Sequence, residues 1–307
     1  MGGYQGSVTL QAGPIYLATP PEFDFEQCLA YLTRSADECL HQVEGQAVFK
    51  ALPVEGGRPT LCKLTEDAGR LQLSFLNGQP DKLAQEAAMD YVRQWFDLQT
   101  DLSVFYRIAA QDKVLGLLTQ TYYGLRLIGI PDLFEALCWA IIGQQINVAF
   151  AYIVKRRFVE AFGERLDVGG VSYWLFPRPE QVARLQAGDL RALQFSTRKA
   201  EYIIGLAQLL AQGELSQDKL QQLHDFEQMQ AALVQLRGIG RWTANYVLMR
   251  CFRHPRAFPI DDVGLHNAVR LAYQLQDKPA IEEIQTLFEP WAGWEAYATF
   301  YLWRALI

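Results

Sequence analysis

Residues 236–246 read Leu-Arg-Gly-Ile-Gly-Arg-Trp-Thr-Ala-Asn-Tyr and decide the fold of this chain. Two glycines flank one aliphatic residue, Ile239, between two stretches with helical periodicity. Gly238 and Gly240 can adopt positive φ and allow close approach, while the helix that follows directs free N–H groups toward an anion. A DNA phosphate is a suitable anion. We therefore predict a hairpin in which Ile239 anchors the turn between its helices and Arg241 adds a positive charge at the rim.

A pair of acids follows this hairpin at a fixed distance. Asp262 lies 24 positions after Gly238 (262 − 238), next to Asp261 and between the proline-bearing residues 258–260 and the helical pattern of residues 263–275. A glycine turn alone is more typical of an ordinary αα-turn than of a phosphate-binding hairpin. An acid directly before a helix is typically an N-cap, so capping is the alternative to a catalytic role for either carboxyl group.

Composition predicts a globular protein. The chain has 307 residues, of which 50% are hydrophobic and 20% charged, enough for two or three packed units. We find no run of roughly 18 apolar residues that could span a membrane. The first residues, Met1 to Tyr4, lack the basic and apolar regions of a secretory signal. We expect a cytoplasmic protein, associated with the nucleoid if its source is bacterial.

The cysteines and the net charge argue against several kinds of site. Five scattered cysteines form no C-x-x-C pair, and their odd number argues against a disulfide framework. A zinc site or an iron–sulfur cluster needs three or four grouped ligands, which this spacing does not offer. A net charge of −6 argues against phosphate neutralisation over the whole surface. A DNA-binding face must therefore be local.

Residues 1–100 predict an N-terminal antiparallel sheet domain, because short alternating stretches are separated by turn residues. The expected strands cover residues 15–18, 47–52, 60–64 and 71–75. Two helices are expected to cover the sheet, one beginning after Asp24 and the other over residues 81–98, where apolar residues recur at four-residue steps.

From residue 101 to residue 307 the strand signal disappears and helical periodicity takes over, so we predict an all-α region. Asp132, preceded by proline, starts one helix, and Pro179 stands in the first turn of another. Gly213 and Gly238 mark helix ends. The predicted fold class is α+β.

The chain resembles the helix-hairpin-helix DNA glycosylase superfamily and, within it, the 3-methyladenine DNA glycosylase II family. The resemblance rests on the 238–246 run, the Asp261–Asp262 pair, and residues 134–145, which are similar to the family's helix leading to its DNA-intercalating loop. It covers residues from about 101 to the C-terminus well and the N-terminal sheet loosely. It implies an N-terminal sheet domain followed by two helical subdomains that flank a cleft, with the hairpin at about 234–246.

The resemblance also implies an activity. It predicts a monofunctional DNA glycosylase that flips alkylated purines, of the 3-methyladenine and 7-methylguanine type, out of duplex DNA and initiates base-excision repair. The motif places the family's catalytic aspartate on Asp262, with Asp261 beside it in the substrate pocket. An alkylated purine is already a good leaving group, so one ionised carboxylate can stabilise the oxocarbenium character of the sugar and orient the attacking water. No cofactor is required, and we expect a monomer.

Aromatic side chains are expected to hold the flipped base. The candidates are Trp242, Tyr246, Trp303 and Tyr31, since stacking and cation–π attraction favour an electron-poor purine. The alternative for each ring is a place in the core. Bifunctional relatives carry a Schiff-base lysine at the hairpin position of Trp242, and a tryptophan cannot form an imine. We therefore predict no β-lyase activity.

Three sets of residues complete the predicted site. The DNA contacts are Gly238, Ile239, Gly240, Arg241, Thr243, Gln144, Gln145, Ile146, Arg198 and Lys199. The family has leucine after Gly-Gln at the wedge that fills the gap left by the base, so either Gln145 or Ile146 can be the wedge here. Basic residues 155–157 either join this face or belong to a solvated surface. The resemblance further suggests a structural monovalent or divalent cation on the backbone carbonyls of Val234, Leu236 and Ile239.

Three alternatives differ in class from this interpretation. A DNA-damage-binding protein can use the same hairpin and wedge without catalysis, and the presence of Asp262 argues against it. A bifunctional oxidised-purine glycosylase would form a covalent adduct with DNA that borohydride traps. An all-α interaction protein, in which Gly-Ile-Gly is only a turn, would show no salt-sensitive binding to duplex DNA.

Overall fold

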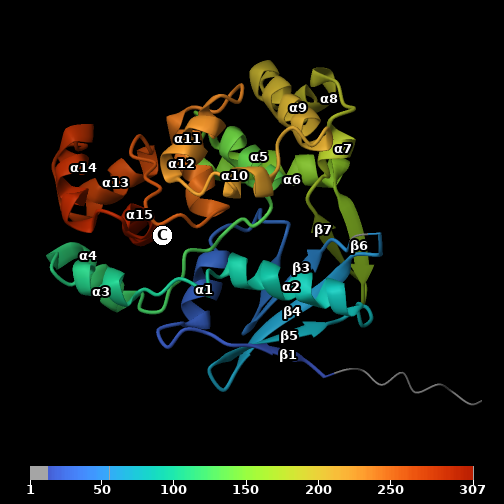
Figure 1. The fold of residues 1–307 in the computed structure, drawn as a ribbon, viewed down its shortest axis with the longest axis horizontal. Helices are drawn as coiled ribbons and strands as arrows, with labels where there is room; N and C mark the ends of the chain where they lie inside the picture. Colours follow the sequence, from blue (N-terminus) through green and yellow to red (C-terminus); the bar gives the residue numbers. More distant parts are fainter. Residues whose placement is uncertain (1–12, 55, 307) are drawn as a thin grey trace, which may run out of the picture.

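The computed structural model describes residues 13–54 and 56–306. A five-stranded antiparallel sheet opens the chain, with the strand order β1-β5-β4-β3-β2 (Figure 1). Its strands are β1 (Ile15–Leu17), β2 (Gln42–Glu44), β3 (Ala47–Leu52), β4 (Thr60–Asp67) and β5 (Arg70–Phe75). The four predicted strands are confirmed. The short β2, which carries two polar residues in three, was not predicted.

The alternation of buried and exposed side chains along each strand sets the register of the sheet. Val48 pairs with Leu64, and Leu64 pairs with Leu73, so three buried aliphatic side chains lie side by side across β3, β4 and β5. Ala68 and Gly69, both at positive φ, form the two-residue turn between β4 and β5 that matches the twist of the strands.

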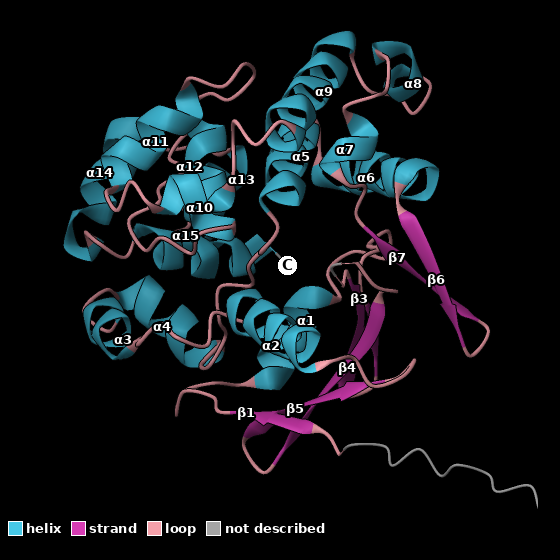
Figure 2. Cartoon of the chain, turned by 45° about the vertical axis from the view of Figure 1, so that its right-hand side comes forward, coloured by secondary structure: helices cyan, strands magenta, loops and turns pink. Residues whose placement is uncertain are grey.

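Two helices cover the inner face of this sheet, as predicted. Helix α1 (Phe25–Leu32) is capped by the carboxylate of Asp24, and α2 (Lys82–Trp95) by that of Asp81. Their apolar faces join the sheet's buried residues in one continuous core. Figure 2 shows both helices between the sheet and the helical region.

The rest of the chain is mainly helical. Helices α3 (Ser103–Ala109), α4 (Lys113–Thr121), α13 (Val263–Ala272), α14 (Ile281–Phe288) and α15 (Glu295–Trp303) form one group, with the 3₁₀ turns η1 (Glu289–Trp291) and η2 (Arg304–Leu306) (Figure 1). A second group consists of α5 (Leu133–Gly143), α6 (Val148–Phe162), α7 (Pro179–Val182), α8 (Ala187–Arg191), α9 (Thr197–Ala211), α10 (Gln217–Gln221), α11 (Phe226–Val234) and α12 (Arg241–Arg250). Asp132 and Pro179 start α5 and α7 as predicted. No helix of the described residues is long and apolar enough to cross a membrane.

The expectation of an all-α region after residue 101 is wrong at one place. A hairpin of β6 (Glu164–Val168) and β7 (Val171–Leu175) interrupts the helices, turned by Gly169 and Gly170 at positive φ. Its apolar residues pack against the N-terminal sheet, because Leu166, Tyr173 and Leu175 share a cluster with Ala51 and Leu61. The hairpin therefore extends the contact between sheet and helical region, and residue 101 is not a clean structural border.

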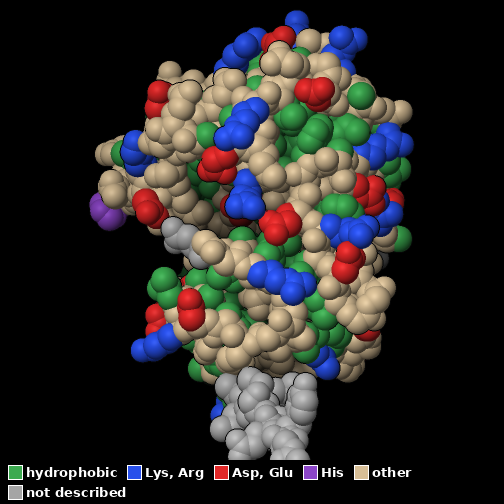
Figure 3. Space-filling view, turned by 90° about the vertical axis from the view of Figure 1, so that its right-hand side faces the viewer, with side chains coloured by type: hydrophobic (Ala, Val, Ile, Leu, Met, Phe, Trp, Pro, Cys, Tyr) green, Lys and Arg blue, Asp and Glu red, His purple; other side chains and the backbone are tan. Residues whose placement is uncertain are grey.

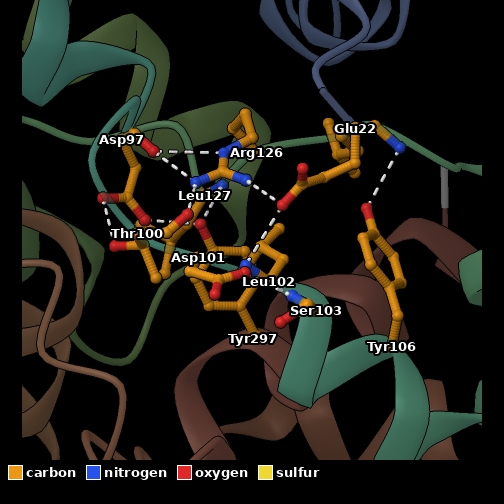
Figure 4. A network of polar contacts seen from close by, with 12 residues as sticks. Glu22, Asp97, Thr100, Asp101, Leu102, Ser103, Tyr106, Arg126, Leu127 and Tyr297 are labelled. Carbon is orange, nitrogen blue, oxygen red and sulfur yellow. Dashed lines mark hydrogen bonds and ion pairs between the residues drawn. The ribbon is translucent and has the colours of Figure 1, made fainter. Parts of the chain in front are cut away.

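A buried polar network joins the link between the two regions to helix α15 (Figure 4). Arg126 is fully buried; its guanidinium donates to the backbone carbonyls of Asp97 and Thr100 and lies 3.7 Å from the carboxylate of Glu22. Tyr297 of α15 donates to the carboxylate of Asp97. Removing one member would leave a buried charge unpaired, which typically costs about 3–5 kcal/mol, so this network fixes how α15 sits on the N-terminal part.

Candidate active site and DNA-binding hairpin

The predicted hairpin lies between α11 and α12, and its two glycines have different roles. Gly238 has φ +90°, and an added Cβ would lie 2.3 Å from the Tyr202 ring of α9. Gly240 has φ −88°, and an added Cβ would meet nothing within 4 Å. Ile239 is 4% exposed and anchors the turn in the core as predicted. Close packing therefore requires the first glycine, while the second leaves the outer surface bare.

Helix α12 begins on this bare surface without a side-chain cap. Gly240 is its N-cap residue, and no side chain accepts from the first N–H groups there. Gly240 and Arg241 are exposed. The N-terminus of this helix thus directs unpaired N–H groups and the positive end of the helix dipole outward.

The carboxylate of Asp262 is held by three donors. Its Oδ1 accepts from the backbone N–H of Leu265 at 2.7 Å and from Nε1 of Trp303 at 3.1 Å, and its Oδ2 accepts from Nε1 of Trp242 at 3.1 Å. The side chain therefore caps α13 and also bridges two indoles, so the capping and the site interpretations are both compatible with this geometry. It is half-buried and not sealed in the interior.

Two further features shape the surroundings of Asp262. An added Cβ at Gly264 would lie 2.8 Å from Oδ1 of Asp262, so the absence of a side chain there keeps room for the carboxylate. The sequence interpretation missed this glycine, although it stands two residues after the acid. The neighbouring acid, Asp261, is exposed. Its predicted place in the substrate pocket stays a prediction.

Three rings form an aromatic cluster around Asp262. The centre of the Tyr246 ring lies 5.4 Å from that of Trp242 and 6.2 Å from that of Trp303, with the ring planes tilted by 31° and 38°. Trp242 and Trp303 are half-buried, and Tyr246 is 8% exposed. Helix α12 and the C-terminal helix α15 thus bring two of the four predicted rings to the Asp262 carboxylate, and the Tyr246 ring packs against both.

The fourth predicted ring, Tyr31 of α1, lies behind this cluster. It is buried and packs 4.6 Å from the ring of Phe300. The guanidinium of Arg250 lies 5.9 Å above the Tyr31 ring and 5.6 Å from that of Tyr246. Tyr31 is therefore a core residue at the rear of the site, and the sequence interpretation missed its neighbours Phe300 and Arg250.

A family model decides what kind of protein carries this arrangement. Residues 138–293, which contain the hairpin, Asp262 and Trp242, match the HhH-GPD superfamily of base excision DNA repair proteins. The chain belongs to this superfamily. Residues 34–137 match the N-terminal domain of 8-oxoguanine DNA glycosylase, which extends the relationship to the part where the sequence resemblance was loose.

Relatives and solved structures agree with this membership. The chain is 45% identical over 294 residues to a DNA-3-methyladenine glycosylase of Bacillus subtilis, covering 95% of this chain and 97% of the relative. It is 29% identical over 283 residues to DNA-3-methyladenine glycosylase 2 of Escherichia coli, covering 92% and 94%. The fold matches the 3-methyladenine DNA glycosylase of Archaeoglobus fulgidus with a TM-score of 0.81 at 24% identity, over 94% and 97% of the two chains. The predicted family and fold class are confirmed.

Three polar residues predicted as DNA contacts make contacts within the protein, and DNA contacts by Gln144 and Lys199 stay predictions. Gln144 donates 3.0 Å bonds to the carbonyl of Gly238 and to the hydroxyl of Thr243, so it ties α5 to the hairpin. Thr243 is 2% exposed, which leaves its side chain out of reach of DNA. The ammonium of Lys199 donates to the carbonyls of Ile142 and Gln144, and burial lowers its pKa. Lys199 therefore caps the C-terminus of α5.

The basic residues 155–157 all have partners within the protein. Lys155 is buried and paired with Glu38 at 2.8 Å. Arg156 pairs with Asp37, and Arg157 donates to Gln194. Figure 3 shows basic and acidic side chains interspersed over one side of the molecule. Arg198 and Arg241 remain exposed, and their DNA contacts stay predictions.

The loop between α5 and α6 distinguishes the two wedge candidates. Gln145 is exposed and has φ +56°, a left-handed conformation that is uncommon for residues other than glycine. Ile146 is half-buried and packs against the core. The left-handed backbone thus leaves the Gln145 side chain exposed to solvent. This geometry favours Gln145 over Ile146 as the wedge.

A cavity of about 40 Å³ lies behind the aromatic cluster, where α1, α5, α6 and α12 meet. Its walls include Glu38, Lys155 and His41, and none of its residues is among the hydrogen-bond donors to the Asp262 side chain. Burial would raise the pKa of Glu38, but the ammonium of Lys155 lowers it well below its usual range. Burial lowers the pKa of His41 to about 4, so this ring is neutral at pH 7.

The carbonyls predicted to hold a structural cation lie at the end of α11 and in the turn after it, and the cation stays a prediction. Among the backbone bonds outside helices and strands, the oxygens of Val234 and Ile239 accept none, and that of Leu236 accepts one from the Ile239 N–H. Helix C-termini leave such carbonyls without partners. No cluster of three or more His, Cys, Asp or Glu side chains suited to a metal occurs among the described residues.

Proposed function

We propose that this chain is a monofunctional DNA glycosylase that hydrolyses the N-glycosidic bond of alkylated purines in duplex DNA and initiates base-excision repair. The observation that carries the proposal is the half-buried carboxylate of Asp262, held between the indoles of Trp242 and Trp303. The Bacillus subtilis relative, a DNA-3-methyladenine glycosylase, supports the alkylated-purine substrate.

The aspartate supplies the chemistry at the sugar. An N-alkylated purine is cationic, so the C1′–N bond breaks with its electron pair passing to the base, which leaves neutral. The ionised Asp262 stabilises the positive charge that develops on the sugar. Water adds to C1′, and the carboxylate orients it and accepts the proton that it loses. Both indole N–H groups keep the carboxylate oxygens in place during this step.

The hairpin supplies the grip on DNA. The uncapped N-terminus of α12, between Gly240 and Arg241, holds a backbone phosphate, and Arg198 adds a second positive charge. Gln145 enters the duplex where the flipped base has left and pairs with the orphaned base. A monovalent or divalent cation on the carbonyls of Val234, Leu236 and Ile239 would add positive charge at the same phosphate. The enzyme acts as a monomer, inside the cell, where its DNA substrate is.

Release of free bases from methylated DNA tests the proposal. Duplex DNA treated with a methylating agent is incubated with the protein, and the released bases are separated by chromatography. We expect free 3-methyladenine and 7-methylguanine to accumulate with time. Unmethylated duplex is the control, and failure to release any methylated base at stoichiometric enzyme would contradict the proposed activity.

A bifunctional glycosylase acting on oxidised purines is the second candidate, because residues 34–137 match the N-terminal domain of 8-oxoguanine DNA glycosylase. Trp242 argues against it, since an indole cannot form the Schiff base of a lyase. We expect that borohydride added during turnover traps no covalent protein–DNA adduct on a denaturing gel. A trapped adduct with methylated or 8-oxoguanine duplex would overturn the assignment as monofunctional.

A further inference from the structure

The loop between α5 and α6, residues 144–147, carries the proposed wedge Gln145, and we call it the wedge loop. A lysine of α9 holds its first residue. The ammonium of Lys199 donates to the carbonyl of Ile142 at 2.8 Å and to that of Gln144 at 2.7 Å. Helix α5 has no basic residue in its last turn, so this cation of α9 supplies the positive charge that a helix C-terminus favours.

The wedge loop is also bonded to the DNA-binding hairpin. The side-chain amide of Gln144 donates to the carbonyl of Gly238 at 3.0 Å and to the hydroxyl of Thr243 at 3.0 Å. A side-chain amide nitrogen has two protons, and these two bonds use both. The residue directly before Gln145 is thus joined to the turn that precedes the uncapped N-terminus of α12.

One face of α9 contacts both the wedge loop and the hairpin. Lys199 and Tyr202 lie three positions apart in α9, and residues at this spacing share a face of the helix. The Tyr202 ring packs so closely on Gly238 that a side chain there would collide with it. The wedge loop, the hairpin and α9 therefore contact one another in pairs, which fixes the place of the wedge relative to the hairpin.

The bond from Lys199 acts on the peptide group that sets the conformation of Gln145. The carbonyl of Gln144 and the N–H of Gln145 belong to one planar peptide group. Rotation of this group changes φ of Gln145, which is +56°, in the left-handed region that side chains disfavour. Holding the Gln144 carbonyl therefore opposes the return of Gln145 to a more favourable region.

We propose that Lys199 and Gln144 are positioning residues that hold the wedge Gln145 at a fixed place relative to the phosphate-binding hairpin before DNA is bound. A loop that is already ordered does not have to lose its conformational freedom when the base leaves the stack. The expected effect of these residues is therefore on extrusion of the base and not on affinity for undamaged duplex. This inference rests on the proposed function.

The test measures base extrusion separately from binding. The duplex carries 7-methylguanine on a 2′-fluorinated sugar, since fluorine disfavours the positive charge needed for cleavage. A neighbouring 2-aminopurine fluoresces when the base beside it leaves the stack. The fluorescence change per bound duplex at saturating protein gives the equilibrium constant for extrusion, and anisotropy of a labelled strand gives the bound fraction. Because only bound duplex counts, the folded fraction of the protein does not enter.

Lys199→Met keeps the aliphatic chain and deletes the ammonium. We expect the equilibrium constant for extrusion to fall about tenfold, as the loss of hydrogen bonds to a charged group predicts. The affinity for undamaged duplex and its dependence on salt should equal those of the wild type. An unchanged extrusion constant would overturn the inference. A weaker salt dependence with normal extrusion would show that Lys199 contacts a phosphate instead.

Lys219→Met is the matched control. The Lys219 ammonium donates to the carbonyl of Gly213 at 2.6 Å, just beyond the other end of α9, and the side chain is exposed. This variant also deletes an ammonium that is bonded to a backbone carbonyl, but it leaves the wedge loop untouched. We expect the wild-type extrusion constant. An equal fall in the two lysine variants would mean a general loosening and would overturn the inference.

Two further variants test whether these residues act through the wedge. Gln145→Ala deletes the wedge, and Lys199→Met should lower extrusion no further in that background, because both changes remove one function. A further tenfold fall would refute the positioning role. Gln144→Leu keeps the ammonium and cuts the bonds to the hairpin, so it should lower extrusion even if Lys199→Met fails to fold, and wild-type extrusion there would also refute the role.

Failure of the inference and failure of the proposed function give different results. A wild-type protein that releases no methylated base contradicts the proposed function, whatever the variants do. A wild-type protein that releases methylated bases, together with Lys199→Met and Gln144→Leu variants that extrude the base like the wild type, contradicts only the positioning role.

Discussion

Replacing Asp262 with asparagine is expected to lower the single-turnover rate of base release by about 100- to 10,000-fold. The charge that stabilises the sugar and the acceptor for the water proton are both lost. The fold should survive, because asparagine is as good an N-cap as aspartate for α13, and an amide oxygen in the place of Oδ1 can still accept from Leu265 and from Trp303. A loss of this size with an unchanged unfolding midpoint separates catalysis from capping.

Asp81→Asn is the matched control for this variant. Asp81 caps α2 through a 2.8 Å bond to the N–H of Ala84, in an exposed position on the N-terminal sheet domain. This variant also replaces an N-cap aspartate with asparagine, but at a helix other than the one that Asp262 caps. We expect its stability and its rate of base release to equal those of the wild type. Base release by Asp262→Asn at the Asp81→Asn rate would show that the aspartate is a cap and nothing more.

Local patterns in the sequence predicted most of the fold. The strands around Val48 and Leu73, the caps Asp24 and Asp132, and the proline at the start of α7 all depend on residues near each other in the chain. The hairpin β6–β7 was missed because its apolar residues are stabilised by contact with Ala51, more than 100 positions away. A five-residue strand with charged residues has little periodicity of its own.

The sequence motif and the spacing of residues along one helix predicted which residues belong to the candidate site. The motif assigned Asp262 and Trp242 to one site, and a 3.1 Å bond joins them in the structure. It did not show which way side chains point. Thr243 was expected to reach DNA, yet it lies one position further around α12 than Trp242 and faces the core. Arg250 was missed because its partners Ile128 and Tyr31 come from distant segments.

Gly238→Ala is expected to destabilise the protein by about 2–4 kcal/mol and to abolish tight binding to duplex DNA. The alanine Cβ would lie 2.3 Å from the Tyr202 ring, and alanine is strained at φ +90°. Relief requires the hairpin to move away from α9, which also displaces the N-terminus of α12. The measurements are the urea unfolding midpoint and the affinity for a duplex at two salt concentrations.

Alanine substitutions at two other glycines distinguish a loss of stability from a loss of DNA affinity. Gly240→Ala puts a methyl group on the exposed side of the turn, at φ −88° with nothing within 4 Å, so the free energy of unfolding should change by less than about 1 kcal/mol. Its affinity for duplex should fall severalfold, since the added methyl stands where the phosphate approaches.

Gly205→Ala is the control variant. It lies in the middle of α9, also without a neighbour within 4 Å of the added Cβ, and should leave DNA affinity unchanged. Equal DNA affinities for Gly240→Ala and Gly205→Ala would mean that the phosphate binds elsewhere, and a Gly238→Ala protein as stable as wild type would mean that α9 does not pack on this turn.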